Sequence, residues 1–594
     1  MNTKWLSLLL VLILALGGLT LARAAPESTP LSQAGGAPTV VSYQGRVQVS
    51  GAPFTGSGYF KFAVVNQAGN ITYWSNDGTG SGGNEPTAAV PLTVNNGLFT
   101  VLLGDTTLSG MTQSLSAAVF AAPDRYLRVW FRPGGSGAFT LLTPDTRIAA
   151  VPYALQAQHA APPGNVIVVA KSNGDFNSIQ GAINSITDAS AGNPYLIWVA
   201  PGWYNEAVKM NPYIHLQGAG QGVTVIQAAV PNGAVLKLVS NTSVRDLSVS
   251  NIGSGPTNYG ISGQDVTGVE IANVFAEAGG LGTSNIAIYL TGDSEVVLEN
   301  VTAEASKASN SNTGLSITLG PEVTLHGGAF TGMGGTYAYG IWVAGGSDTF
   351  LGAADVRAIG QDASDTNAGL ENGNYPTVLL QGGFFLGSGG EYAYGIYNHN
   401  AALLEAEGVT AQGENAETAR ALYNYTDSRA ILRGGSFTAR TSVTAGMAYA
   451  IHNAGGANTI LETHDVTALA EGTAYSQGLR NEAAGTVARV NGGTFTARGG
   501  SMTAIGISTW GNLTAQGTSA LAENGTVGNY GLYVSGDQAR ADACRFKGST
   551  YAVRETSGAL YLAVSQLDGG MQRTAGTVTC FEVYNGNYAA YSCP

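Results

Sequence analysis

A recurring set of outward-facing side chains in the C-terminal two-thirds of the chain could bind a ligand. Each is the middle residue of a three-residue pattern in which an apolar residue comes first and, in most repeats, an asparagine comes third, as in Ile396-Tyr397-Asn398. In a strand the apolar residue and the asparagine share one face, so the middle residue points outward. Aromatic rings held on a rigid sheet can pack against the C–H groups of sugars. The set is Trp342, Glu371, Tyr397, Tyr423, His452, Arg480, Ser508 and Tyr533.

We therefore predict a ligand-binding stripe for polysaccharide or another cell-surface ligand. Its members would be Trp342, Tyr397, Tyr423, His452, Arg480 and Tyr533. The alternative is that aromatic residues only cover the sheet, because they suit strands.

Catalytic patterns are absent from the sequence. The six histidines, among them His215 and His326, show no His-x-x-x-His spacing that would indicate a metal site. We predict no catalytic residue, no metal and no cofactor. A polysaccharide-active enzyme stays as the alternative, because carboxylates from separate parts of a repeat could converge. A structural spacer is the third interpretation.

Two columns of repeated residues indicate how the stripe is held. Asparagines recur at intervals of 26, 26, 29 and 28 residues, a spacing at which stacked amides would form a ladder. Phenylalanines recur every 51 to 58 residues with valines such as Val301 and Val356 midway, so we expect one core column that alternates Val and Phe. The asparagines are Asn372, Asn398, Asn424, Asn453 and Asn481, and the phenylalanines are Phe330, Phe385, Phe437, Phe495 and Phe546.

A period of 24 to 29 residues is typical of a repeat fold. The leucine-rich spacing of a horseshoe and the Trp-Asp signature of a propeller are both missing. Short alternating strands with Gly and Asn turns favour a parallel β-helix of about fifteen coils over residues 165–572. We expect a capping helix near residues 178–187 and a C-terminal cap over 573–594. A Cys580–Cys593 disulfide could close that cap, with Cys544 as a buried apolar residue.

Composition limits the partners. The chain has 594 residues, 11% of them charged, and a formal net charge of −13. An acidic chain with few Lys and Arg argues against nucleic acid and anionic membranes. Lys4, the apolar run Leu6–Leu16 and Ala22-Arg23-Ala24 predict a signal peptide over residues 1–24, cleaved after Ala24. We therefore expect a secreted or surface-displayed protein with no membrane segment after cleavage; the oligomeric state is left open.

Residues 25–37 are rich in Pro, Ser, Ala and Gly and indicate a linker. Residues 38–160 contain short alternating segments that predict a β-sandwich. This region resembles a β-domain near the N-terminus of many secreted bacterial surface proteins. The resemblance rests on Tyr43-Gln44-Gly45-Arg46, Asn96-Gly97-Leu98-Phe99 and Pro152-Tyr153-Ala154, and it implies export and display.

The start of the repeat region resembles the opening of pectin methylesterases. The matching segments, within about residues 165–250, are Gly174-Asp175-Phe176-Asn177-Ser178-Ile179, Ile197-Trp198-Val199-Ala200-Pro201-Gly202 and Ile214-His215-Leu216-Gln217-Gly218. The resemblance implies a right-handed parallel β-helix of the pectin-lyase-like superfamily with a helix over its first coil. The catalytic motifs of that family are not found, and Gln264-Asp265 and Gln361-Asp362 are interpreted as turns. The expected fold class is all-β: a right-handed parallel β-helix preceded by a small β-sandwich domain.

Overall fold

The structure is a computed structural model that describes residues 40–115, 119, 125–148 and 165–594. The chain divides into two compact units, Met1–Ala161 and Pro162–Pro594. The predicted signal peptide, the linker and the Pro152-Tyr153-Ala154 segment lie outside the described residues. Across the part of the chain described, no helix is long and apolar enough to cross a membrane.

The N-terminal unit is built from antiparallel sheets. In the larger sheet, β4 pairs with β8 on one side and with β5 and β6 on the other, and β8 pairs with β9. Phe60 on β4 packs against Phe99 on β7 with 4.2 Å between ring centroids, which joins the larger sheet to the β1–β7 pair. The predicted two-sheet arrangement is therefore present. The strands are β1 (Val41–Arg46), β2 (Gln48–Val49), β3 (Ala52–Pro53), β4 (Gly56–Val65), β5 (Thr72–Ser75), β6 (Val90–Val94), β7 (Leu98–Leu103), β8 (Tyr126–Pro133) and β9 (Thr140–Arg147).

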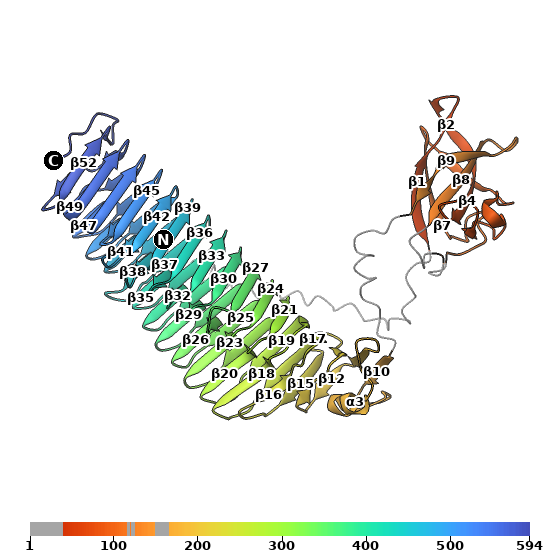
Figure 1. Ribbon diagram of the computed structural model, residues 1–594, viewed down its shortest axis with the longest axis horizontal. Helices are drawn as coiled ribbons and strands as arrows, with labels where there is room; N and C mark the ends of the chain where they lie inside the picture. The colour runs from red at the N-terminus through yellow and green to blue at the C-terminus, as the bar shows by residue number, and fades with distance from the viewer. Residues whose placement is uncertain (1–39, 116–118, 120–124, 149–164) are drawn as a thin grey trace, which may run out of the picture. The chain divides into compact units, whose positions relative to one another are not determined.

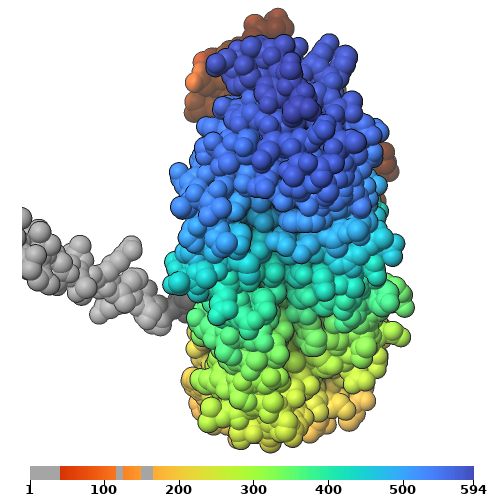
Figure 2. All heavy atoms as spheres, turned by 90° about the vertical axis from the view of Figure 1, so that its left-hand side faces the viewer, coloured from red at the N-terminus to blue at the C-terminus, as the bar shows by residue number. Residues whose placement is uncertain are grey.

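The second unit is a right-handed parallel β-helix of about 14 turns, as the repeat and the pectin-methylesterase resemblance predicted. Each strand pairs in parallel with its equivalents one coil earlier and one coil later, so three sheets run along the axis. Figure 1 shows the coils stacked in sequence order, and Figure 2 shows the same order as successive colour bands on the surface.

The three sheets differ in strand length. One sheet has strands of about eight residues, and we call it the long-strand sheet. Its main members are β18 (Thr257–Gln264), β20 (Ser284–Thr291), β23 (Ser311–Thr318), β26 (Tyr337–Ala344), β29 (Thr366–Gly373), β32 (Tyr392–His399), β35 (Thr418–Tyr425), β38 (Met447–Ala454), β41 (Tyr475–Asn481), β44 (Thr503–Thr509), β47 (Gly528–Asp542) and β49 (Tyr551–Ala563).

The other two sheets consist mostly of five-residue strands. The second sheet includes β21 (Glu295–Glu299), β24 (Glu322–His326), β27 (Phe350–Ala354), β30 (Thr377–Gln381), β33 (Leu403–Glu407), β36 (Arg429–Arg433), β39 (Ile460–His464), β42 (Val487–Asn491) and β45 (Asn512–Gln516). The third includes β22 (Thr302–Ser306), β25 (Ala329–Met333), β28 (Arg357–Gln361), β31 (Phe384–Ser388), β34 (Thr410–Glu414), β37 (Ser436–Arg440), β40 (Thr467–Glu471), β43 (Thr494–Arg498), β46 (Ser519–Glu523) and β48 (Arg545–Gly548).

A buried asparagine ladder holds the long-strand sheet to its neighbour. Asn372, Asn398, Asn424 and Asn453 each donate Nδ2 to the Oδ1 of the next asparagine at 2.7–2.8 Å. Every rung from Asn372 to Asn481 also donates to a backbone carbonyl of the following coil. From Asn398 to Asn481 each amide therefore bonds to the coil before it and the coil after it, which is the arrangement that the constant spacing predicted.

The phenylalanine column differs from the prediction. Phe385 is in register with Ala358 and Ala411, not with Val356 or Val409. The same alternation of Phe and Ala runs from Ala303 to Phe546. Equivalent residues lie only ~4.8 Å apart, so a large ring needs a small side chain above and below it to reach native packing density. The valines lie two residues before the alanines and are buried in the same core.

Each end of the β-helix is covered by its own segment. At the N-terminal end, helix α3 (Ile179–Ser185) buries Ile179 and Ile183 against the first coils, and Figure 1 shows it at the foot of the stack. Glu206 accepts hydrogen bonds from the backbone N–H groups of Ile179 and Gln180 at 2.8 and 2.9 Å, which satisfies the free donors of the first turn. At the other end, parallel pairing continues past residue 572 through β52 (Thr577–Phe581) and β53 (Tyr584–Asn585).

The Cys580–Cys593 disulfide closes the C-terminal segment, and Cys593 packs against the core. The Cys580→Ser/Cys593→Ser variant is expected to lose about 3 kcal/mol, because the link no longer restricts the unfolded chain. Hydrogen exchange should show the loss in β52 and β53 and not in the middle coils, since neighbouring repeats couple mainly to each other. Cys544→Ala serves as the control for cysteine replacement. Uniform loss of protection along the β-helix would contradict this prediction.

Candidate functional site

The predicted stripe exists as one column on the outer face of the long-strand sheet. Trp342 is in register with Glu371, Glu371 with Tyr397, and Tyr397 with Tyr423. The column continues through His452, Arg480, Ser508 and Tyr533 to Arg554.

The middle of this column does not present open ring faces. Tyr397 and Tyr423 stack with centroids 5.3 Å apart and planes 7° apart, and Tyr423 stacks on His452 at 4.8 Å. Trp342, whose neighbour in the column is Glu371, stacks instead on Tyr339 of its own strand at 6.2 Å. The coil rise of ~4.8 Å is close to a ring-stacking distance, so neighbouring rings cover one another. In this stretch a ligand would meet mainly ring edges, which weakens the reason for placing sugar rings there.

The face opens into a groove where short side chains interrupt the aromatic columns. On β44 (Thr503–Thr509), Ser508 lies between Arg480 and Tyr533 of the neighbouring coils. Thr503 lies between Tyr475 and Gly528, and the groove over these coils has a volume of about 590 Å³. Ser508 is fully buried and donates a hydrogen bond to Gln477, a residue of the groove lining. Around this break the rings tilt, with 44° between Trp510 and Tyr533. The groove is defined by its lining residues, which are Arg420, Met447, Tyr449, His452, Tyr475, Gln477, Arg480, Glu482, Thr503, Ile505, Trp510, Val527, Tyr530, Tyr533 and Arg554.

A polar network fixes the groove wall. Arg420 Nε donates to His452 Nδ1 at 3.0 Å, so Nδ1 is the acceptor and the ring proton is on Nε2. His452 Nε2 then donates to Glu482 Oε2 at 2.7 Å. Arg480 binds the same carboxylate through two nitrogens, both at 2.8 Å. Both nitrogens of His452 are therefore engaged as a neutral imidazole, which leaves it no free lone pair for general base catalysis.

The neutral state of His452 predicts an acid-sensitive groove. Burial lowers the pKa of His452 to about 3, although the hydrogen bond to Glu482 acts to raise it. The hydrogen bond from His452 first, and that from Arg480, lower the pKa of Glu482 despite its partial burial. Because an unfolded histidine titrates near ~6.5, only the unfolded chain binds this proton between pH ~6.5 and ~3. We expect stability to fall as pH drops through that window, and more steeply in the wild type than in His452→Gln. Denaturant titrations of both proteins at several pH values measure the free energy of unfolding. The same dependence of this free energy on pH in the wild type and in His452→Gln would contradict the prediction.

The groove is locally basic although the chain is acidic. The groove lining contains three arginines, Arg420, Arg480 and Arg554, and one carboxylate, Glu482. The whole chain, by contrast, has a net charge of −13. Arg480 lies between Tyr449 and Trp510, its guanidinium carbon 5.2 and 5.1 Å from their ring centroids. Arg554 Nη1 donates to Tyr530 at 2.7 Å, whereas its buried Nε has no hydrogen-bond partner among the described residues. The groove therefore holds positively charged guanidinium groups in place beside aromatic surface.

Glu371 and Glu482, the two carboxylates that bind histidines on this face, are too far apart to form a glycosidase pair. Glu371 binds His399 at 3.1 Å, and Glu482 binds His452. Four coil spacings separate the two carboxylates, or about 19 Å, against ~5–9.5 Å for paired carboxylates in glycosidases. Asp265 and Asp362 lie in left-handed turn positions, at φ 52° and 61°. Within the described ranges no group of three or more His, Cys, Asp or Glu could hold a metal ion.

The structure brings together only part of the predicted site. His452, Arg480 and Tyr533 line the groove. Tyr397 and Tyr423 stack on each other away from it, and Trp342 stacks on Tyr339 of its own strand. The additional groove residues Tyr449 and Tyr530 lie three residues before His452 and Tyr533. This position recurs in Tyr-Gly-Ile at 339 and 394, so the repeat contained a signal for the second aromatic column.

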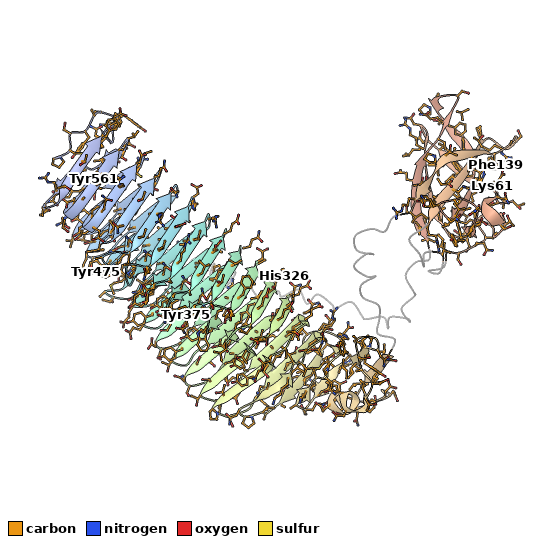
Figure 3. The ribbon with its side chains drawn as sticks, viewed as in Figure 1. Lys61, Phe139, His326, Tyr375, Tyr475 and Tyr561 are labelled. Atoms are coloured by element: carbon orange, nitrogen blue, oxygen red, sulfur yellow. A yellow bond between two sulfur atoms is a disulfide. The ribbon has the colours of Figure 1, made fainter. Side chains whose placement is uncertain are left out.

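A smaller hollow of about 380 Å³ lies on the second sheet. It is lined by His326, Gly352, Glu405, Glu407 and Arg433, among others. Figure 3 places His326 on the edge of the β-helix opposite Tyr475, so this hollow and the groove open on different faces. Its lining holds no aromatic residue.

Comparisons with known proteins found one family model for the N-terminal unit and a set of similar solved structures. Residues 42–145 match a family described as "Domain of unknown function (DUF8740)". No curated protein matches the chain. Similar solved structures include the A-module of mannuronan C-5 epimerase AlgE4 from Azotobacter vinelandii, at 13% identity over 70% of this chain and 95% of that chain, with a TM-score of 0.33. Pectin methylesterase from carrot matches at 11% identity over 70% of this chain and 88% of that chain, with a TM-score of 0.22.

The catalytic domain of a GH87 α-1,3-glucanase matches at 11% identity over 94% of this chain and 89% of that chain, with a TM-score of 0.24. Similarity at these levels gives no ground for assigning any of these activities to this chain.

Proposed function

We propose that this protein is a non-catalytic binding protein that holds a carbohydrate chain in the groove between β35 and β49. The observation that carries the proposal is the break in the aromatic columns at β44, where tilted rings and fixed guanidinium donors surround one opening. Pockets for sugars need both apolar surface and a few oriented polar groups, and this groove supplies both.

An acidic polysaccharide fits the groove better than a neutral one. Three arginines face one carboxylate in the lining, and His452 is neutral. Guanidinium groups bind carboxylates and sulfates in paired geometry. The net charge of −13 opposes long-range attraction of a polyanion, so we expect recognition to depend on contacts inside the groove.

Export and surface display belong to the same proposal. They are supported by the sequence pattern of residues 1–24 and by the resemblance of the N-terminal β-domain to domains of secreted bacterial surface proteins. The N-terminal unit would then serve display, and the β-helix would serve adhesion.

The test is binding of the protein beginning at Ala25 to an array of neutral and acidic polysaccharides. Each bound polysaccharide is then assayed for new reducing ends and for released methanol. Saturable binding without turnover is the expected result. Binding with turnover would instead establish a polysaccharide-active enzyme, and failure to bind any glycan would favour a structural spacer.

A further inference from the structure

A buried carboxylate lies in the column that the asparagine ladder begins, near its C-terminal end. Beyond Asn481, the in-register residues are Thr509, Val534 and Glu555. Glu555 is completely buried, and neither of its carboxylate oxygens has a hydrogen-bond partner among the described residues.

The ladder shows what is missing at this position. Asn481 donates to Thr509 at 3.0 Å and to the carbonyl oxygen of Asn512 at 3.1 Å. An ionised carboxylate has only acceptors, so it cannot donate to a carbonyl of the next coil as the asparagines do. A buried carboxylate without a partner is costly, and in proteins such groups are paired or coordinate a metal ion.

Neither nearby arginine pairs with Glu555. Arg554 precedes it in the strand, points to the opposite face and binds Tyr530 in the groove. Arg573 is in register with Glu555 on β51 (Met571–Arg573), but it is exposed and its Nη1 lies 3.5 Å from the carbonyl oxygen of Pro594.

An oxygen of Glu555 and the backbone carbonyl oxygen of Gly558 both lie beside Gly576, which has no side chain. A Cβ added to Gly576 would overlap both Oε1 of Glu555 and the carbonyl oxygen of Gly558. Only glycine at position 576 leaves this space open. Both are oxygen acceptors, the Glu555 oxygen has no hydrogen-bond partner among the described residues, and a cation between them would bind both.

We propose that Glu555 and the carbonyl oxygen of Gly558 bind a hard, oxygen-preferring metal cation inside the last coils, with water completing its coordination. The cation replaces the amide donors of the ladder and joins the coil of β49 to the chain around Gly576. Together with the Cys580–Cys593 disulfide, it secures the C-terminal end of the β-helix.

The test is thermal unfolding of the disulfide-intact protein beginning at Ala25, after chelation and then with Ca²⁺, Mg²⁺, Na⁺ or K⁺ added. Ca²⁺ is expected to raise the unfolding temperature of the β-helix by about 5 °C, with one site per chain by calorimetric titration. A response to Na⁺ or K⁺ alone would identify a monovalent site of the same chemistry.

The Glu555→Gln variant separates this site from general ion effects. Its amide can donate where the asparagines do, so it should unfold at or above the temperature of the cation-loaded wild type and gain nothing from added cation. Glu299→Gln, at an exposed position of β21, should respond as the wild type does. Absence of a cation response in the wild type, or an undiminished response in Glu555→Gln, would overturn the proposal. If Glu555→Gln fails to fold, the wild-type titration alone decides, and zero bound ions overturns it.

Discussion

Replacing Asn424 with alanine is expected to lower the free energy of unfolding of the β-helix by about 3–5 kcal/mol. Asn424 is fully buried, donates to Asn453 at 2.7 Å and to the carbonyl oxygen of Ile460 at 3.0 Å, and accepts from Asn398 at 2.8 Å. Truncation leaves these groups without water to replace the lost bonds, and each buried unsatisfied group costs about 1–3 kcal/mol. Denaturant unfolding followed by circular dichroism measures the loss.

The matched control is Asn310→Ala, since Asn310 is an exposed asparagine of the same β-helix. It should stay within about 0.5 kcal/mol of the wild type. Asn424→Asp distinguishes hydrogen bonding from packing, because it keeps the shape but loses the donor. An Asn424→Ala variant as stable as Asn310→Ala would show that the ladder accompanies the fold without stabilising it.

The repeat made the fold predictable because a β-helix places residues by period alone. Constant spacing of Asn372 through Asn481 implied one column, and the column in the structure is joined by amide hydrogen bonds. Spacing alone did not set the packing of the phenylalanines. Val356 has the expected mid-period position, yet Ala358 lies between the phenylalanine rings. At a separation of ~4.8 Å there is room for only a small side chain between two rings.

The site was less predictable than the fold. Register put Tyr397, Tyr423 and His452 in one outward column, as expected, but register does not say whether rings expose faces or stack. That depends on what occupies the same column one coil away. The outward column changes from rings to Arg480 and then to the small, buried Ser508 before it reaches Tyr533, and the groove lies over this stretch. Glu482 lies just outside the repeat pattern. Interruptions of a repeat carry little signal in a search for the repeat itself.

The Trp510→Ala/Tyr533→Ala variant is expected to weaken glycan binding by about 2–3 kcal/mol, or roughly 30- to 150-fold. Both rings line the groove and lie tilted beside the opening, so their removal takes away apolar surface that a sugar would cover. Trp510 also packs against the Arg480 guanidinium at 5.1 Å. Its removal would let the Arg480 side chain move, and ordering that side chain again on binding would cost affinity. Titration calorimetry with a polysaccharide that binds the wild type measures the change.

Tyr397→Ala/Tyr423→Ala removes two rings from the stacked stretch and is the matched control. These rings already cover each other at 5.3 Å, so we expect binding to change by less than about threefold, while the thermal stability of the β-helix decreases. The two variants assign the binding surface by their contrast. Equal losses of affinity in the two variants would indicate that the ligand contacts the whole aromatic column. A loss of affinity confined to Tyr397→Ala/Tyr423→Ala would place binding on the ring edges and contradict binding in the groove.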